Sequence, residues 1–367
     1  MNSIVKKKVV ALLAVVMVIF AACGDDDSTA TTTGAATTVA AAPTTAAPTT
    51  AAPTTVAALV TVRQAQFLGA GMHLPEVAGL ALGIFEDHGI KMELQPLGNT
   101  GLHLAGLVSG SLQVAANAPV VVANAMSEGT ELQYFCGQVA TDWNVLLTGP
   151  ESDIPTIEDG ASWQEVVQSL EGRDVGVSSR GGTQETRMLV LLELAGVDPS
   201  SVGFVGVGAV AESMAALEAG LVDTIFGFPF VTQRLLADGN ARIALDLTKY
   251  GPDPAFLTGY FATSEWLAEN ADVAQSYCDA VHETIEFLSD PANVDELNEI
   301  LETEFGLDTA EVRDQAVGEF GVLPLYDTNL DCDSIQRALD LAVVGGIIAE
   351  EAPTDCAALI WDEARER

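Results

Sequence analysis

Ser178-Ser179-Arg180-Gly181-Gly182-Thr183-Gln184-Glu185-Thr186-Arg187 is the stretch on which the fold assignment depends. It follows a short apolar run, Val175-Gly176-Val177, and precedes apolar residues at helical spacing, Met188, Leu191, Leu192 and Ala195. This order predicts a strand, a glycine turn and the start of a helix. The backbone N–H groups of such a turn lie at the positive end of the helix dipole, where an anion can bind. The sequence therefore predicts that this turn forms one wall of a ligand cleft.

The order of strand, turn and helix is repeated on either side of this stretch. Residues 59–149 contain one set of such units and residues 150–247 contain a second. The two sets match in places: residues 85–90 are similar to 192–197, and residues 107–112 to 217–222. Alternating strands and helices predict an α/β protein with mostly parallel sheets and helices on both faces. We therefore expect two similar lobes, followed by a mainly helical segment at residues 248–367.

The chain is strongly acidic, with 52 Asp and Glu residues, 15 Lys and Arg residues and a formal net charge of -37. Nucleic acid and anionic lipid surfaces are therefore poor partners. Solubility or a salty habitat is sufficient to explain such acidity. Because the overall field opposes an anionic ligand, an anion site needs local positive groups, and Arg180 and Arg187 both lie within residues 178–187. Arg180 is the better candidate, since its guanidinium matches a sulfonate, phosphate or carboxylate.

The first 58 residues predict export and tethering. Lys6-Lys7-Lys8 precedes uncharged residues 9–22, a run too short to span a bilayer but typical of a secretory signal peptide. Ala21-Ala22-Cys23-Gly24 is similar to the lipobox of bacterial lipoproteins. We expect residues 1–22 to be cleaved and Cys23 to be lipidated, anchoring the protein to the outer face of the cell membrane. An ordinary signal peptide that leaves a free Cys23 thiol is the alternative.

The segment of residues 23–58 is a Thr/Ala/Pro tract with near-repeats of Ala-Ala-Pro-Thr-Thr. It has neither an apolar period nor an aromatic residue, so it cannot bury a core. We therefore predict a disordered, partly extended tether between the lipid anchor and the folded part.

Four further cysteines, Cys136, Cys278, Cys332 and Cys356, allow two disulfides in an exported protein, with three possible pairings. Cys332 and Cys356 flank an expected helical hairpin, which favours that pair and leaves Cys136 with Cys278. Four buried thiols are the alternative.

Ligands of open α/β sheets bind at the carboxyl ends of strands, where helices begin. The sequence places four turns at such positions: residues 71–75, 116–119, 178–183 and 227–230. Facing lobes with convergent helix N-termini favour a cleft for a small anionic or polar ligand. Aromatic side chains near these turns can stack on a flat ligand. The candidate ligand-binding residues are His73, Leu74, Asn117, Ala118, Trp143, Ser178, Ser179, Arg180, Gly182, Thr183, Phe228 and Phe230.

Several enzyme signatures are incomplete. Residues 206–211 fit a dinucleotide fingerprint ending in Ala, but an exported protein meets little NAD. Residues 176–180 lack the last glycine of the serine-hydrolase elbow, and no phosphate-loop lysine follows the glycines. The histidines at 73, 88, 103 and 282 have no zinc spacing. We therefore expect no metal, no cofactor and no catalysis.

Six short segments, in order over residues 60–250, resemble the periplasmic substrate-binding proteins of ABC importers. The type they resemble is the nitrate, sulfonate, taurine and thiamine-pyrimidine-precursor family. The segments are His73-Leu-Pro, Gly83-Ile-Phe, Leu107-Val-Ser-Gly-Ser-Leu, Gly172-Arg-Asp-Val-Gly-Val, Leu194-Ala-Gly-Val-Asp-Pro and Leu217-Glu-Ala-Gly-Leu-Val-Asp. The C-terminal third is similar only in its helical character.

This resemblance implies a two-lobe clamshell of the type II periplasmic-binding-protein fold. It implies that the chain crosses between the lobes twice, near residues 148–155 and 245–254, and that the C-terminal helices return to the first lobe. It also implies a monomer that delivers a small ligand to an ABC permease. Two alternatives remain: an enzyme similar to the thiamine-pyrimidine synthases, which would use His73, and a surface sensor that presents its loaded form to a signalling partner.

Overall fold

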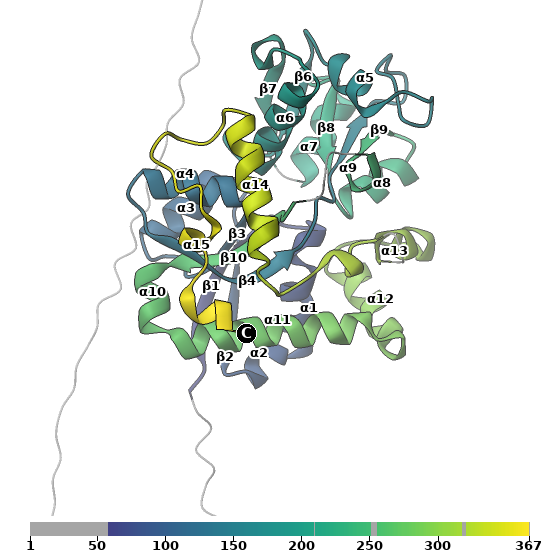
Figure 1. Ribbon diagram of the computed structural model, residues 1–367. Helices are drawn as coiled ribbons and strands as arrows, with labels where there is room; N and C mark the ends of the chain where they lie inside the picture. Colours follow the sequence, from purple (N-terminus) through teal and green to yellow (C-terminus); the bar gives the residue numbers. More distant parts are fainter. Residues whose placement is uncertain (1–57, 209, 251–254, 318–320, 367) are drawn as a thin grey trace, which may run out of the picture. The chain divides into compact units, whose positions relative to one another are not determined.

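The computed structural model describes residues 58–208, 210–250, 255–317 and 321–366, all within one compact unit that spans residues 56–367 (Figure 1). The predicted signal peptide, the predicted lipidation at Cys23 and nearly all of the predicted tether lie outside the described residues. Among the described residues, no helix is both long enough and apolar enough to cross a membrane.

The first lobe is built on five strands. β1 and β2 pair in parallel, and β10 pairs antiparallel with β3 on one side and with β4 on the other. A parallel bridge between Gln64 of β1 and Val114, next to β3, joins these two parts into the order β2-β1-β3-β10-β4. The bounds are Val60–Gln66 for β1, Ile90–Pro96 for β2, Ala115–Asn117 for β3, Leu132–Val139 for β4 and Thr258–Thr263 for β10.

The second lobe repeats this arrangement in a five-stranded sheet of order β7-β6-β8-β5-β9. β6 is parallel to β7 and β8, whereas β5 is antiparallel to β8 and β9. In both lobes the antiparallel strand occupies the fourth place in the order, so the two lobes are similar, as the sequence repeat predicts. The bounds are Val145–Thr148 for β5, Asp174–Val177 for β6, Gly203–Gly206 for β7, Thr224–Gly227 for β8 and Arg242–Asp246 for β9.

Cap residues and glycines set the ends of several helices, although residues 75–88, expected as one helix, form two, α1 and α2, divided at Gly83. The α3 helix begins after Asn99, whose side chain accepts the N–H of Leu102 at 2.9 Å, and α1 ends at Gly83, which adopts the left-handed φ of 77° that glycine tolerates. The first-lobe helices are η1 (Gly71–His73), α1 (Leu74–Leu82), α2 (Ile84–Asp87), α3 (Thr100–Val108) and α4 (Pro119–Ser127). The second-lobe helices are α5 (Trp163–Gln168), α6 (Thr183–Leu194), η2 (Pro199–Ser201), α7 (Val210–Glu218), α8 (Val231–Ala237) and α9 (Leu247–Tyr250).

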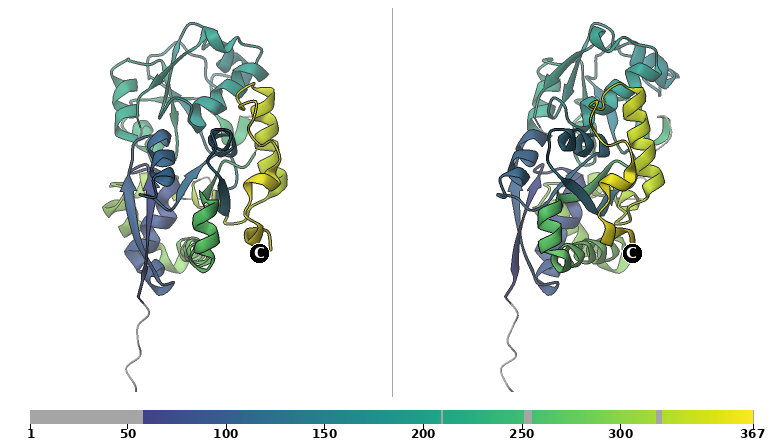
Figure 2. Two further views of the ribbon diagram at one scale, coloured as in Figure 1. Left: turned by 90° about the vertical axis from the view of Figure 1, so that its left-hand side faces the viewer. Right: turned by 60° about the vertical axis from the view of Figure 1, so that its left-hand side comes forward.

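The C-terminal segment contacts both lobes (Figure 2). The long α11 packs on α1, α2 and β4 of the first lobe, as the family resemblance implies. In contrast, α14 lies against both α4 and α6, and α13 lies against α8 of the second lobe. The bounds are α10 Ser264–Glu269, α11 Ala271–Ser289, η3 Pro291–Asn293, α12 Val294–Thr303, α13 Ala310–Val317, η4 Leu323–Leu325, α14 Cys332–Val344, α15 Cys356–Leu359 and η5 Asp362–Glu366.

The first crossing between the lobes differs from its expected position. β5 pairs only with strands of the second lobe, so the chain has already crossed before residue 145. The first crossing is therefore residues 140–144, between β4 and β5, rather than residues 148–155. The lobe boundary therefore lies before residue 149, where the sequence placed it. The partners of β5, β8 and β9, come much later in the chain, so no local pattern assigns β5 to the second lobe. The second crossing follows α9 and leads to β10, and residues 251–254 within it are not described.

The described residues contain two disulfides, Cys136–Cys278 and Cys332–Cys356, which is the pairing that the sequence favours. The first joins β4 to α11 within the first lobe, and the second joins α14 to α15.

The lobes are in direct contact. The N–H of Gly71, in η1, donates to the carbonyl oxygen of Pro229, between β8 and α8, at 3.2 Å. One buried apolar cluster contains Leu74 of the first lobe, Phe230 of the second and Leu301 of α12. Since burial of each large apolar side chain contributes about 1.5–3 kcal/mol, this shared core holds the two lobes together on one side of the cavity described next.

Candidate functional site

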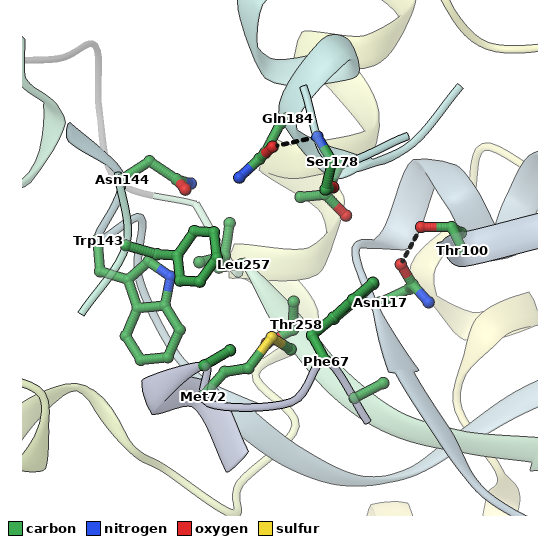
Figure 3. Close-up of a pocket in the computed structure, with 14 residues that line it drawn as sticks. Phe67, Met72, Thr100, Asn117, Trp143, Asn144, Ser178, Gln184, Leu257 and Thr258 are labelled. Atoms are coloured by element: carbon green, nitrogen blue, oxygen red, sulfur yellow. Dashed lines mark hydrogen bonds between the residues drawn. The ribbon is translucent and has the colours of Figure 1, made fainter. Parts of the chain in front are cut away.

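A cavity of about 60 Å³ lies between the two lobes, at the carboxyl ends of several strands (Figure 3). Its walls come from both lobes, from the first crossing and from the strand β10. None of its lining side chains, among the described residues, is acidic, basic or a histidine. The lining residues are Phe67, Ala70, Met72, Thr100, Ala116, Asn117, Trp143, Asn144, Ser178, Thr183, Gln184, Phe228, Leu257 and Thr258.

Hydrogen bonds to the protein set the orientation of two amide side chains at this cavity. The Oε1 atom of Gln184 accepts the backbone N–H of Ser178 at 2.7 Å, so its Nε2 atom remains as a donor. The Nδ2 atom of Asn144 donates to Oδ1 of Asp142 at 2.7 Å, so its Oδ1 atom remains as an acceptor. Figure 3 shows the two amide groups pointing toward one another. Together they offer a ligand one donor and one acceptor.

A third amide, that of Asn117 in β3, carries an unused donor. Its Oδ1 atom accepts the hydroxyl of Thr100 at 3.4 Å, and its Nδ2 atom has no hydrogen-bond partner among the described residues although the residue is only 3% exposed. An unpaired buried donor costs about 1–3 kcal/mol. A ligand with an acceptor at this position would recover that free energy.

Aromatic side chains form the apolar walls of the cavity. Trp143 and Phe228 are buried, and Phe67 packs on His103 with ring centroids 4.5 Å apart. Trp143 is supported from behind by Tyr326, with ring centroids 6.1 Å apart in a T-shaped arrangement. Flat, supported rings beside amide groups suit a planar polar molecule.

In the turn of residues 178–183, Glu185 engages Arg180 and the N–H of Gly181. The carboxylate of Glu185 accepts the N–H of Gly181 at 2.6 Å and the Nε–H of Arg180 at 2.8 Å, and its other oxygen lies 2.8 Å from Nη2 of Arg180. This hydrogen bonding to Glu185 raises the pKa of Arg180. A carboxylate of the chain itself therefore engages Arg180 and one of the turn's N–H groups, both of which the sequence predicts for a ligand anion.

Arg180 also lies away from the cavity, which corrects the expectation that it pairs with the ligand. Its side chain is 60% exposed and donates to the carbonyl oxygen of Phe204 at 3.1 Å. The acidic residue five positions after Arg180 was the one local signal of this pairing.

His73 is 1% exposed and lies inside the first lobe, not at the cavity. Its Nε2 atom accepts the N–H of Phe67 at 3.1 Å, so the ring proton of the neutral form is on Nδ1, which faces Oε1 of Glu76 at 3.0 Å. Both ring nitrogens are therefore engaged within the lobe.

The other expected residues divide into two groups. Five line the cavity: Asn117, Trp143, Ser178, Thr183 and Phe228. The rest lie elsewhere. Leu74 and Phe230 are in the shared core, and Ala118 lines a neighbouring cavity. Ser179 and Gly182 lie at the contact between the lobes. The hydroxyl of Ser179 donates to that of Thr100 across this contact at 3.2 Å.

Sequence reasoning missed several cavity residues, among them Asn144, Gln184 and Thr258. Asn144 directly follows Trp143 at the first crossing, so its position in the sequence could have predicted that it also lines the cavity. Thr258 begins β10, which enters the first sheet from a distant part of the chain, and no local pattern places it there. Among the described residues, no group of three or more side chains is arranged to hold a metal ion.

Comparison with protein families gives a match to the model described as NMT1/THI5 like, over residues 71–293, which is more than half of the chain. No curated protein matches the sequence.

Solved structures share the fold. The alkanesulfonate-binding protein SsuA from Xanthomonas axonopodis pv. citri, bound to MOPS, has a TM-score of 0.65 and 16% identity, covering 83% of this chain and 99% of its own. The periplasmic nitrate-binding protein NrtA from Synechocystis PCC 6803 has a TM-score of 0.64 and 16% identity, covering 84% and 89%. A Candida albicans protein described as having the periplasmic binding protein fold has a TM-score of 0.59 and 17% identity, covering 80% and 92%. The chain therefore has the periplasmic-binding-protein fold.

Proposed function

Because the chain belongs to the NMT1/THI5-like family, whose structural relatives are mostly binding proteins, we propose that it is an extracytoplasmic solute-binding lipoprotein of an ABC importer. It takes a small polar organic molecule into the cavity between its lobes and delivers it to a membrane permease. The observation that carries this proposal is the cavity itself, which combines uncharged hydrogen-bonding side chains with aromatic walls from both lobes.

The part of the ligand in this cavity is neutral and planar, as in a pyrimidine or another small heteroaromatic ring. No ionised side chain among the residues that line the cavity is available to balance a charge there, and Arg180, the cation predicted to pair with a nitrate or sulfonate, pairs with Glu185. The donor of Gln184 and the acceptor of Asn144 match a ring edge that carries one acceptor and one donor.

Binding rather than catalysis is supported by the position of His73. The enzyme alternative needs this imidazole at the ligand, and both of its nitrogens are engaged inside the first lobe. The predicted export signal and Cys23 favour a location outside the cell membrane, where a permease partner is accessible.

Mass spectrometry of the molecule that co-purifies with the protein, followed by calorimetric titration of that molecule, tests the proposal. Asn117→Ala removes one donor to the ligand and is expected to weaken binding by roughly 5- to 150-fold. Arg180→Gln is the matched control, and its affinity should equal that of the wild type. The proposal fails if Arg180→Gln abolishes binding while Asn117→Ala has no effect, or if only inorganic anions bind.

A further inference from the structure

A second cavity of about 60 Å³ adjoins the first and shares Thr183 and Leu257 with it. It lies where α4 of the first lobe, α6 of the second lobe and the C-terminal α14 come together. Its lining residues are Ala118, Pro119, Val120, Asp142, Thr183, Thr186, Arg187, Val190, Ala255, Phe256, Leu257, Ala338, Leu341 and Ala342. Unlike the first cavity, it has charged side chains in its wall, the basic Arg187 and the acidic Asp142.

The side chain of Arg187 is only 11% exposed, and Asp142 contacts one edge of its guanidinium group. Its Nε atom lies 2.5 Å from Oδ2 of Asp142, while Oδ1 of Asp142 accepts both the N–H and the side-chain amide of Asn144 at 3.0 Å and 2.7 Å. The Nη1 and Nη2 atoms of Arg187 make no hydrogen bond to any described residue. The contact with Asp142 is an ion pair in which neither Nε of Arg187 nor Oδ2 of Asp142 has a hydrogen-bond partner, and the Nη fork is left for a second oxyanion.

Other groups around this cavity also favour negative charge. Thr183, Thr186, Arg187 and Val190 follow the spacing of one face of α6, so two hydroxyls lie on the same face as the guanidinium. The N-terminus of α4, at Pro119 and Val120, forms another part of the wall and has no side-chain cap. The positive end of this helix dipole therefore points to the same space. The long α14 covers the cavity with Leu341 and two alanines, which limits access of water.

We propose that the second cavity holds an acidic group of the transported molecule, a carboxylate, sulfonate or phosphate, bound by Arg187, Thr183 and Thr186. The inference rests on the proposed function, since the neutral planar part of the same molecule occupies the first cavity. The ligand is thus a small planar polar ring joined to an acidic group. The alternative role of Arg187 is a lobe contact through Asp142 and nothing more.

The test compares three forms of the purified full chain: wild type, the double variant Asp142→Asn/Arg187→Gln, and Arg180→Gln. The double variant removes the buried cation together with its carboxylate partner, so no unpaired buried charge remains, and the amide oxygen introduced at position 142 still accepts from Asn144. Thermal unfolding is measured in sodium methanesulfonate and in sodium chloride at equal ionic strength. We expect methanesulfonate to raise the Tm of the wild type and of Arg180→Gln above the chloride value, and to have no such effect on the double variant.

An equal shift in all three proteins, or no shift in the wild type, overturns the inference. Thr186→Val provides a second variant that keeps the shape and charge of the site while removing one hydroxyl, and it should weaken methanesulfonate binding about fivefold; an unchanged affinity contradicts the assignment.

The co-purifying molecule separates this inference from the proposed function. An acidic molecule whose affinity falls roughly 10- to 150-fold in the double variant supports the inference. An uncharged molecule that binds all three proteins equally overturns it and leaves the proposed function intact.

Discussion

Gly71→Ala should strain the contact between the two lobes without disturbing the interior of either lobe. A Cβ atom built on Gly71 lies 2.9 Å from Cβ and 3.0 Å from the carbonyl oxygen of Pro229, in the opposite lobe. The contacts on the Pro229 side are a backbone atom and a rigid ring, so they cannot move aside as a flexible side chain would. Gly71 is also held in place because the phenol of Tyr326 donates to its carbonyl oxygen. The strain therefore falls on the contact between the lobes and destabilises the closed form.

Overpacking of this kind costs about 1–3 kcal/mol. The whole cost falls on the closed form, so the dissociation constant of the co-purifying ligand should rise roughly 5- to 150-fold. Calorimetric titration measures this change, and small-angle X-ray scattering should show a larger radius of gyration than that of the wild type. Gly98→Ala is the matched control in the same lobe, because a Cβ atom there meets nothing within 4 Å.

If Gly71→Ala keeps both the affinity and the radius of gyration of the wild type, the predicted strain at the lobe contact is wrong. Equal losses in Gly71→Ala and Gly98→Ala would also refute it, because the effect would then not come from the lobe contact.

Three further predictions concern stability and location. Burial lowers the pKa of His103 from 6.5 to about 4, against a smaller opposing effect of its hydrogen bond to the Leu97 carbonyl oxygen, so protonation favours unfolding. As pH falls from 6.5 toward 4, the unfolding free energy of the wild type should therefore decrease by about 3 kcal/mol more than that of His103→Gln. Urea unfolding at each pH measures this difference. If the unfolding free energies of the two proteins change in parallel with pH, the prediction is wrong. The double variant Cys136→Ala/Cys278→Ala removes a disulfide between residues 142 positions apart and should lower the unfolding free energy by about 2–5 kcal/mol. An unchanged urea midpoint would show that this disulfide does not stabilise the fold. Cys23→Ser should move the protein from the membrane fraction to the soluble fraction, and a variant that still sediments with membranes excludes Cys23 as the anchor.

Local sequence properties determined the class of fold. The apolar run before Ser178, the glycine turn and the helical spacing after it predict β6 and α6, and the structure has both. The repeat of this order predicts two similar lobes. Strand and helix periodicity, turn glycines and caps depend on residues within a few positions of one another, so a single sequence carries this information.

The side chains that line the cavity depended on tertiary structure. The sequence placed two arginines beside a glycine turn, and the structure assigns them different partners: Arg180 pairs with Glu185 at the surface, while Arg187 pairs with Asp142 from the first crossing. Thr258 reaches the cavity because β10 inserts between β3 and β4. The physical reason is that these pairings form only when the chain folds into two packed lobes, because they join residues that are far apart in the sequence. The sequence alone thus predicted a cavity at the turn of residues 178–183, where Ser178 and Thr183 line one, and only the packing of the lobes decided which other side chains face it.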